Sequence, residues 1–322
     1  MGEKWVTAQL LEEAVQKCSN WSKWGADDQV GTLNYVTPKM IVDAARLIRH
    51  GRIYPLSIPL DRTGPQEPNP LTNRWNPIHT MLATGTDVYA EVQPNSSYGC
   101  GYADDAISLP TQCSTQWDSL SHVFYKNRMY NGYDARLVDV RGAAKNGIQN
   151  TIGRMAGRGV LLDVARFKGM DWLPDGYGIS GDELDACAKA QGVEVRRGDF
   201  VIFRTGQMEG RLSRGSWDGY CGGDAPGLKF ETCYWLHEKE VAGICADTWG
   251  CEVRPNETVM PFVQPWHAVV IPAMGLTMGE IFFLKDLAES CAHDGVFEFF
   301  FTAPPLNITG GCGSPITPIA IK

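Results

Sequence analysis

An acid and an imidazole stand four residues apart in the segment TQCSTQWDSLSHVFY (111–125): Asp118 and His122. Two glutamines precede them, Gln112 and Gln116, so that polar side chains recur at intervals of four, two and four. Because residues two apart in an extended segment point to the same face, all four side chains could share one face. Carboxylates and neutral imidazoles are ligands for divalent metals. The segment therefore indicates either a metal site or a turn in which Asp118 and His122 bond nearby backbone, and the spacing alone does not distinguish the two.

Further groups of the same chemistry lie in the last quarter of the chain. His267 and Glu280 belong to the segment PWHAVVIPAMGLTMGE (265–280). Asp247 directly follows the apolar run VAGICA, and ligands in α/β sheets usually sit where strands end in loops. A metal site needs ligands that converge from separate elements, and Asp118, His122, His267 and Glu280 supply suitable atoms. Asp247 has two interpretations: it orients a ligand, or it caps the end of a strand.

Competing catalytic motifs are weak in this sequence. There is no Gly-x-Ser-x-Gly motif and no serine or cysteine beside a histidine that would indicate a nucleophile. The glycines of GRMAGRGVLLDV (153–164) precede a predicted strand, whereas a dinucleotide-binding loop follows its strand and opens a helix. These glycines are better interpreted as turn residues.

Hydrophobic periodicity predicts an α/β domain that would position these residues. Thr37 and Pro38 are a typical helix start, ahead of a helical pattern that ends at Gly51. Ser180 and Glu183 form a predicted capping box before a second helix. Short apolar runs bounded by turn residues predict buried strands. The predicted strands are 159–164, 198–206, 241–247, 267–272 and 297–306, with a further helix at 284–292.

Length and composition exclude several classes of protein. The 322 residues carry no internal repeat or long linker, which favours one compact domain over residues 1–322. Hydrophobic residues make up 43% of the chain, yet none of its apolar runs approaches the roughly 20 residues that span a bilayer. The formal charge is −8 with scattered Lys and Arg, which argues against nucleic acid as a partner. The start of the chain does not resemble a secretory signal, so a cytoplasmic protein with mostly reduced, buried cysteines is expected.

Several segments together resemble the cyclase-type metal-dependent hydrolases, the family of bacterial kynurenine formamidase and isatin hydrolase. The likeness runs from about Trp24 to the C-terminus, which leaves residues 1–23 as an N-terminal extension. The segments are WGADDQVGTLNYVTP, GRGVLLDVARFKG, GVEVRRGDFVIFRTG, ADTWGCEVRPNE and PITPIAIK.

The family motif, His-x-Gly-Thr-His-x-Asp-x-Pro-x-His, aligns with residues 112–122 without gaps. Asp118 and His122 match its aspartate and last histidine, and Thr115 matches its threonine. This sequence departs from the motif at its other positions, which are Gln112 and Gln116 in place of the first two histidines, Ser114 in place of glycine and Leu120 in place of proline.

The resemblance implies a swivelling β/β/α fold with a mixed sheet, in an assembly that is dimeric or higher. It also implies a metal site made by Asp118, His267 and Glu280, with the amide oxygen of Gln116 as an optional ligand. Because two imidazoles are replaced, the ligand set shifts toward oxygen, which favours Mn²⁺, while His267 still admits Zn²⁺. One divalent ion is expected rather than two.

The activity that the resemblance implies is hydrolytic opening of a cyclic or aryl amide, imide or lactone, with His122 as the proton shuttle. The expected substrate-binding residues are His79, Gln112, Trp117 and Tyr130, although aromatic residues at this density also suit a core. Two other functions remain open. One is a cyclisation or dehydration at the same metal site, and the other is a metal-free binding protein that has lost catalysis.

Overall fold

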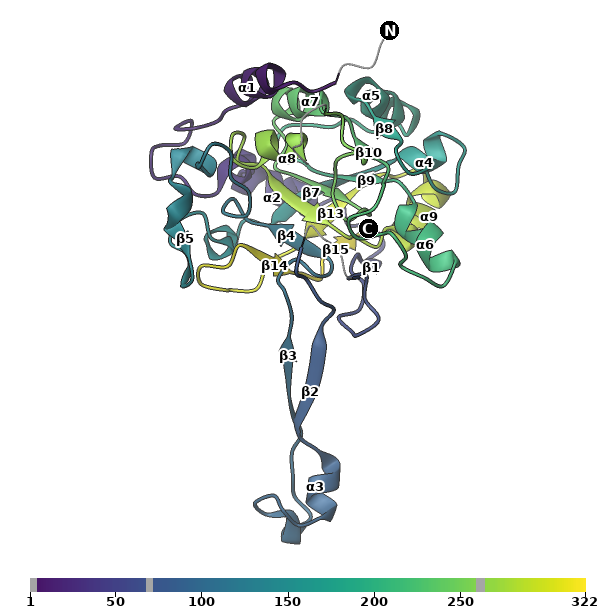
Figure 1. Cartoon of the computed structure of the whole chain (residues 1–322). Helices are drawn as coiled ribbons and strands as arrows, with labels where there is room; N and C mark the ends of the chain where they lie inside the picture. The colour runs from purple at the N-terminus through teal and green to yellow at the C-terminus, as the bar shows by residue number, and fades with distance from the viewer. Residues whose placement is uncertain (1–4, 68–71, 259–263) are drawn as a thin grey trace.

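Three of the predicted buried runs form adjacent parallel strands at the centre of a nine-stranded mixed sheet: β7 (Ala156–Asp163), β9 (Phe200–Arg204) and β11 (Gly243–Ala246). The computed structural model in which they are seen describes residues 5–67, 72–258 and 264–322 (Figure 1). β12 (Thr277–Glu280) continues the parallel run, and antiparallel strands flank it on both sides. In spatial order the remaining strands are β1 (Ile53–Pro55), β15 (Ile319–Ile321) and β13 (Glu298–Thr302) on one side, and β4 (Gln116–Asp118) and β14 (Gly313–Pro315) on the other. This mixed sheet confirms the α/β fold expected from the sequence.

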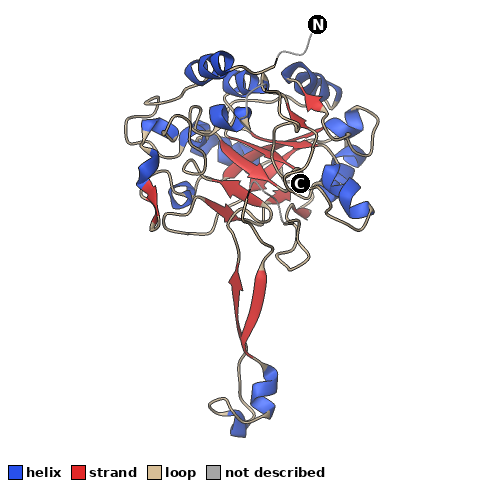
Figure 2. Ribbon diagram, in the orientation of Figure 1, coloured by secondary structure: helices blue, strands red, loops and turns tan. Residues whose placement is uncertain are grey.

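Apolar side chains cover both faces of the central strands, which explains why these strands are continuous apolar runs. In β7, Val160 and Leu162 belong to one buried cluster and Leu161 to another. The same alternation holds in β9, where Val201 and Phe203 lie on one side and Phe200 and Ile202 on the other. Figure 2 shows the helices arranged around the sheet. Their bounds are α1 (Ala8–Lys17), α2 (Pro38–Ala45), α3 (Gly85–Tyr89), α4 (Val164–Phe167), α5 (Gly181–Ala190), α6 (Gln207–Ser213), α7 (Thr232–Lys239), α8 (Pro265–Val270) and α9 (Lys285–Asp294).

Short elements complete the described structure. Five 3₁₀ helices are η1 (Gly31–Tyr35), η2 (Ser96–Tyr98), η3 (Tyr130–Gly132), η4 (Ala135–Leu137) and η5 (Ile148–Thr151). Three two-stranded sheets pair β2 (Ile78–Ala83) with β3 (Asp104–Ser108), β5 (Val138–Asp139) with β6 (Gly142–Ala143), and β8 (Gly178–Ile179) with β10 (Gly227–Leu228). Among the described residues, no helix has the length and apolar character needed to cross a membrane.

The predicted helix starts are confirmed in detail. The Thr37 side chain accepts a hydrogen bond from the Met40 backbone N–H, and α2 follows with Pro38 in its first turn. Ser180 caps α5 by accepting from the Glu183 backbone N–H. The return half of that capping box is absent, because the Glu183 carboxylate accepts from the Tyr177 hydroxyl instead.

The strand predicted at 267–272 is wrong, because α8 occupies this part of the chain. Every residue of α8 is buried, and a short run that is apolar apart from His267 has no periodicity that separates a buried helix from a buried strand. The strand of this region is β12, whose sequence TMGE has no apolar alternation.

The N-terminal residues pack onto the body of the fold. Leu11 and Ala14 of α1 join the cluster that contains α8, and the Val6 N–H donates to the Glu257 carbonyl. Residues 1–4 of the expected extension lie outside the described residues.

Candidate metal centre and its cavity

Strand pairing brings three polar side chains of the candidate site together. β4 runs antiparallel to β12, with Gln116 opposite Glu280 and Asp118 opposite Met278. Because alternate residues of a strand share a face, Gln116 and Asp118 lie on the same side as Glu280. The side chain between them, Trp117, points to the opposite face. Of the four side chains expected to share one face of an extended segment, Gln116 and Asp118 lie in β4 and do so, whereas Gln112 and His122 lie outside the strand, in the turns on either side of it.

The imidazole of the site comes from the first turn of α8. His267 is buried, and its Nδ1 contacts the carboxylate of Glu252 at short range. The same carboxylate accepts from the backbone N–H groups of His267 (3.2 Å) and Trp266 (3.3 Å) and from the Asn256 amide (3.1 Å). Glu252 thus orients the ring so that Nε2 faces Glu280, 3.4 Å from its Oε1. A carboxylate behind a histidine in this way is typical of metal-binding histidines.

Ligand atoms of Asp118, His267 and Glu280 lie within 4.8 Å of one another, and all three residues are buried. This arrangement fits a divalent cation, because buried carboxylates this close need a positive charge between them. Gln116 lies beside the trio, but its amide N–H groups donate to Glu280 (2.8 Å) and Asp118 (3.4 Å). Its Oε1 is buried without a partner. As placed, Gln116 therefore contacts the ligand carboxylates through nitrogen, and not as the oxygen ligand that was expected.

The charges of the trio perturb one another. Burial and the Asp118 carboxylate raise the pKa of Glu280 to about 7, against the effect of His267. Burial lowers the pKa of His267, but the hydrogen bonds with Glu252 and Glu280 outweigh it and raise the pKa to about 10. In the absence of a metal ion, the imidazolium of His267 is thus the group that neutralises the surrounding carboxylates.

His122 lies at the edge of the trio, with its Nε2 3.8 Å from the Asp118 carboxylate. Both ring nitrogens face donors: Arg74 Nη2 is 3.4 Å from Nε2, and Gln112 Nε2 is 3.5 Å from Nδ1. A guanidinium donates and never accepts, so these contacts favour the neutral ring. Burial lowers the pKa of His122, Asp118 opposes the shift, and the positive charge of Arg74 lowers it further. His122 is therefore a neutral base near neutral pH.

A cavity of about 120 Å³ joins these groups, lined by Thr72, Arg74, Asp118, His122, Val123, Trp249, Gln264, His267 and Glu280. The cavity is large enough to hold more than one water molecule. Among the described residues that line this cavity, Arg74 is the only lysine or arginine. The Arg74 guanidinium lies 5.8 Å from the ring centroid of Trp249 and donates to the Gln112 carbonyl at 3.3 Å.

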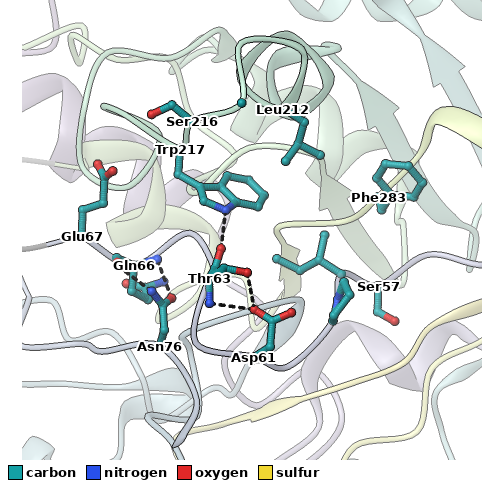
Figure 3. A pocket seen from close by; sticks show the side chains of 14 residues that line it. Ser57, Asp61, Thr63, Gln66, Glu67, Asn76, Leu212, Ser216, Trp217 and Phe283 are labelled. Carbon is teal, nitrogen blue, oxygen red and sulfur yellow. Dashed lines mark hydrogen bonds between the residues drawn. The ribbon is translucent and has the colours of Figure 1, made fainter.

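A separate cavity of about 760 Å³ lies between the segment 57–67 and the loop 212–217. In Figure 3 its wall carries Trp217, whose indole N–H donates to the Thr63 carbonyl at 2.8 Å, and Asp61, which accepts from Thr63. The volume is typical of a small-molecule site. None of the trio lines it. Gln66 lines it and donates to the Cys113 carbonyl at 2.8 Å, which connects the wall to the segment before β4.

Trp117, Tyr130 and His79, which were expected to bind substrate, do not line the cavity of about 120 Å³. Trp117 is fully buried against Phe282 and Phe301, with its indole N–H bonded to the Ala303 carbonyl, so it is a core residue. Tyr130 is also fully buried, and its hydroxyl donates to Asp28.

His79 lies on the exposed ribbon of β2 and β3, 2.7 Å from the Asp105 carboxylate. Its side chain is 51% exposed, and it does not line either cavity. Gln112 contacts His122, with its Nε2 3.5 Å from Nδ1 of the ring, but it does not line the cavity. Asp247 accepts from the Thr205 backbone and hydroxyl and from the Gly206 backbone, so it fastens the end of β9 to β11 and lines neither cavity.

Sequence reasoning missed Arg74 and Glu252. Arg74 belongs to the irregular segment NRWNP, which has no periodicity or motif. Glu252 lies in WGCEVRP, within one of the segments that resemble the family, and that resemblance assigns no role to the acid. Metal-binding histidines usually contact a carboxylate through their second ring nitrogen, and this rule is the one signal that could have indicated an acid such as Glu252 beside His267.

The mixed α/β fold thus brings a buried pair of carboxylates and an oriented imidazole together at one site. The model of the "Putative cyclase" family matches residues 54–253. The crystal structure of a novel cyclase is 40% identical, with a TM-score of 0.84, and the match covers 95% of this chain and 100% of that one. The chain therefore belongs to the cyclase family.

More distant structures share the fold. Isatin hydrolase A from Ralstonia solanacearum is 18% identical with a TM-score of 0.62, over 84% of this chain and 92% of that one. Isatin hydrolase A from Labrenzia aggregata, bound to benzyl benzoate, is 17% identical with a TM-score of 0.61, over 84% and 93% of the two chains. The comparison with curated proteins gives no match.

Proposed function

We propose that this protein is a metal-dependent hydrolase that opens a cyclic or aryl amide, imide or lactone. The observation that carries the proposal is the convergence of Asp118, His267 and Glu280 within 4.8 Å, with His267 oriented by Glu252. The fold shared with isatin hydrolases supports the same class of reaction.

The three residues would hold one divalent ion, Mn²⁺ or Zn²⁺, because two carboxylates and one imidazole suit either. The chemistry that such an ion supplies is polarisation of a carbonyl and a lower pKa for water. Gln116 would keep the Asp118 and Glu280 carboxylates in position through its amide N–H groups.

His122 would accept a proton from water at one ring nitrogen and return it to the leaving nitrogen or oxygen. The surroundings support this role, since the lowered pKa keeps the ring neutral before the reaction. The Asp118 carboxylate, 3.8 Å from Nε2, would stabilise the imidazolium that forms. Arg74 would donate to an oxygen of the substrate, since its guanidinium lines the cavity beside His122.

A cyclisation or dehydration at the same site is the second candidate, because the 40% identical structure is described as a novel cyclase. The two reactions differ in the fate of solvent oxygen. A metal-loaded sample is incubated in ¹⁸O-labelled water with a panel of aryl amides, lactams, imides and lactones, and the products are analysed by mass spectrometry. Hydrolysis requires one labelled oxygen in the product, whereas ring formation with loss of water incorporates none.

The metal itself is tested before turnover. Protein grown with ample Zn²⁺ and Mn²⁺ is expected to retain close to one ion per chain, and Asp118→Ala to retain none. Wild-type protein without an ion after such growth would rule out both enzymatic functions and leave the metal-free binding protein.

A further inference from the structure

The cavity of the candidate metal centre contains one cation that forms no ion pair with the described residues, the guanidinium of Arg74. It is partly buried, donates to the Gln112 carbonyl at 3.3 Å and lies 3.4 Å from Nε2 of His122. Both neighbours are uncharged, since the pKa of His122 is lowered. Burial makes an unpaired charge costly, so a guanidinium in this position is expected to meet an anion.

The two carboxylates that line the same cavity are engaged elsewhere. Asp118 and Glu280 each accept from the Gln116 amide, and Glu280 also faces Nε2 of His267 at 3.4 Å. Arg74 shifts the pKa of Glu280 less than burial or the other two ionised residues of the cavity do. A divalent ion held by the trio would balance both negative charges. The guanidinium of Arg74 is then the uncompensated charge of this cavity.

Trp249 supplies a second unused donor to the cavity. Its side chain is 5% exposed and lines the cavity, with the ring centroid 5.8 Å from the Arg74 guanidinium. Its Nε1 is buried and has no hydrogen-bond partner among the described residues. The guanidinium of Arg254 lies 5.3 Å from the same centroid and donates to the carbonyls of Gly222 and Gly223. Arg254 therefore helps to fix the indole beside Arg74.

We propose that the substrate carries a carboxylate in addition to the bond that is opened, and that Arg74 and the Trp249 N–H bind this carboxylate. The inference rests on the proposed hydrolysis and narrows its substrate class to acids. A carboxylate has roughly four lone-pair sites, about twice as many as a neutral carbonyl, so it can accept from both donors at once. Arg74 and the trio line one cavity of about 120 Å³, so the carboxylate lies only a few bonds from the reacting carbonyl.

A contact between Arg74 and the reacting carbonyl alone would have a different kinetic effect. Such a contact would make Arg74 equally important for charged and for neutral substrates. A contact with a separate carboxylate affects only substrates that carry one. It is also made in the ground state as well as in the transition state, so its loss raises KM and leaves kcat nearly unchanged.

Binding is measured by isothermal titration calorimetry with benzoate and with benzamide, which has a similar shape and no charge. Metal-loaded wild-type protein is expected to bind benzoate about 10-fold more tightly, or better. Arg74→Met should abolish this preference, and Arg74→Lys, which keeps the charge without the planar fork, should retain part of it. Arg49→Met is the matched control, because Arg49 is exposed after α2 and does not line the cavity. No preference in the wild type, or a preference that survives in Arg74→Met, would overturn the inference.

A variant without the ion separates this inference from the proposed function. Asp118→Ala is expected to retain no metal, and it removes one negative charge from the cavity, so benzoate should still bind more tightly than benzamide. Adding Arg74→Met to Asp118→Ala should remove this preference. If the wild-type protein binds no metal, the hydrolase proposal fails, yet these two variants still test the carboxylate site. Equal affinities of Asp118→Ala for benzoate and benzamide would overturn the inference whatever the metal content.

Turnover tests the substrate class. An aryl amide that the protein hydrolyses is compared with the same amide bearing a ring carboxylate. Arg74→Met is expected to raise KM for the acid about 10-fold or more, to keep its kcat within about 2-fold, and to leave both constants for the neutral amide unchanged. An equal fall in kcat for both compounds would show that Arg74 contacts the reacting carbonyl instead, and the inference would be wrong.

Discussion

The carboxylate pair predicts that the site destabilises the protein when no metal is bound. Asp118 and Glu280 are buried with ligand atoms at most 4.8 Å apart. At an effective dielectric constant of about 20, two negative charges at that distance repel by about 3.5 kcal/mol. The raised pKa of Glu280 reports the same strain, since burial and Asp118 disfavour its ionised form. The imidazolium of His267 offsets part of this repulsion.

Asp118→Asn removes one charge and keeps an oxygen that can accept from Gln116. In the presence of a chelator at pH 8, where Glu280 is mostly ionised, we expect the free energy of unfolding to increase by about 1–2 kcal/mol, because relief of the repulsion exceeds the weaker attraction to His267. With metal at 100 times its dissociation constant, the wild-type protein gains about 2.7 kcal/mol. The variant, which lacks one ligand, should gain much less, so the order of stability reverses.

Urea unfolding followed by tryptophan fluorescence measures both effects, with and without metal, provided that the slope with denaturant is the same for all variants. Glu289→Gln is the control, because it removes an exposed charge on α9 and should change stability by less than about 0.5 kcal/mol in either condition. An Asp118→Asn variant that is less stable than wild type in chelator, or equal stabilisation of the two proteins by metal, would show that Asp118 and Glu280 do not repel each other in this way.

Other predictions concern the groups around the trio. His122→Ala should retain the metal, as measured by elemental analysis, and its turnover should fall about 10²–10⁴-fold. Equal metal loss in His122→Ala and Asp118→Ala would show that ligand and proton shuttle are misassigned. Because the pKa of His122 is lowered, activity plotted against pH should fall on the acid side at a pH below the usual range of histidine. Arg74→Met removes a positive charge that lowers this pKa, so the fall in activity should move to higher pH. An unchanged position would exclude His122 as the base. Glu252→Ala should reduce the free energy of unfolding by about 3 kcal/mol in chelator, because it leaves several buried N–H groups unpaired, and a loss below 1 kcal/mol would contradict this accounting.

The family motif contributes Asp118 to the site but not the two histidines that precede it there. Gln116 occupies one of these positions and donates to both carboxylates, which an imidazole with a single N–H cannot do. Its Oε1 is buried without a hydrogen-bond partner. In this structure, Gln116 therefore contacts the two carboxylates through its amide nitrogen.

Residue type and local spacing determined which side chains share a face, which segments form buried strands and where two of the helices begin. The two-residue interval between Gln116 and Asp118 places them on one face of any strand, and the apolar runs within 159–164 and 198–206 are typical of strands that are buried on both sides. The helix starts at Thr37 and Ser180 were predictable because capping involves residues that are neighbours in the chain.

Only the tertiary structure decided what meets these residues. The register that places Glu280 opposite Gln116 joins positions 164 residues apart, and no local pattern encodes such a pairing. The same is true of Glu252 behind His267 and of Arg74 beside His122, which come from irregular segments. The exposure of the ribbon of β2 and β3 was equally hidden in the sequence. Its apolar residues resemble those of a buried strand, and only the fold shows that none of the described residues covers them (Figure 1).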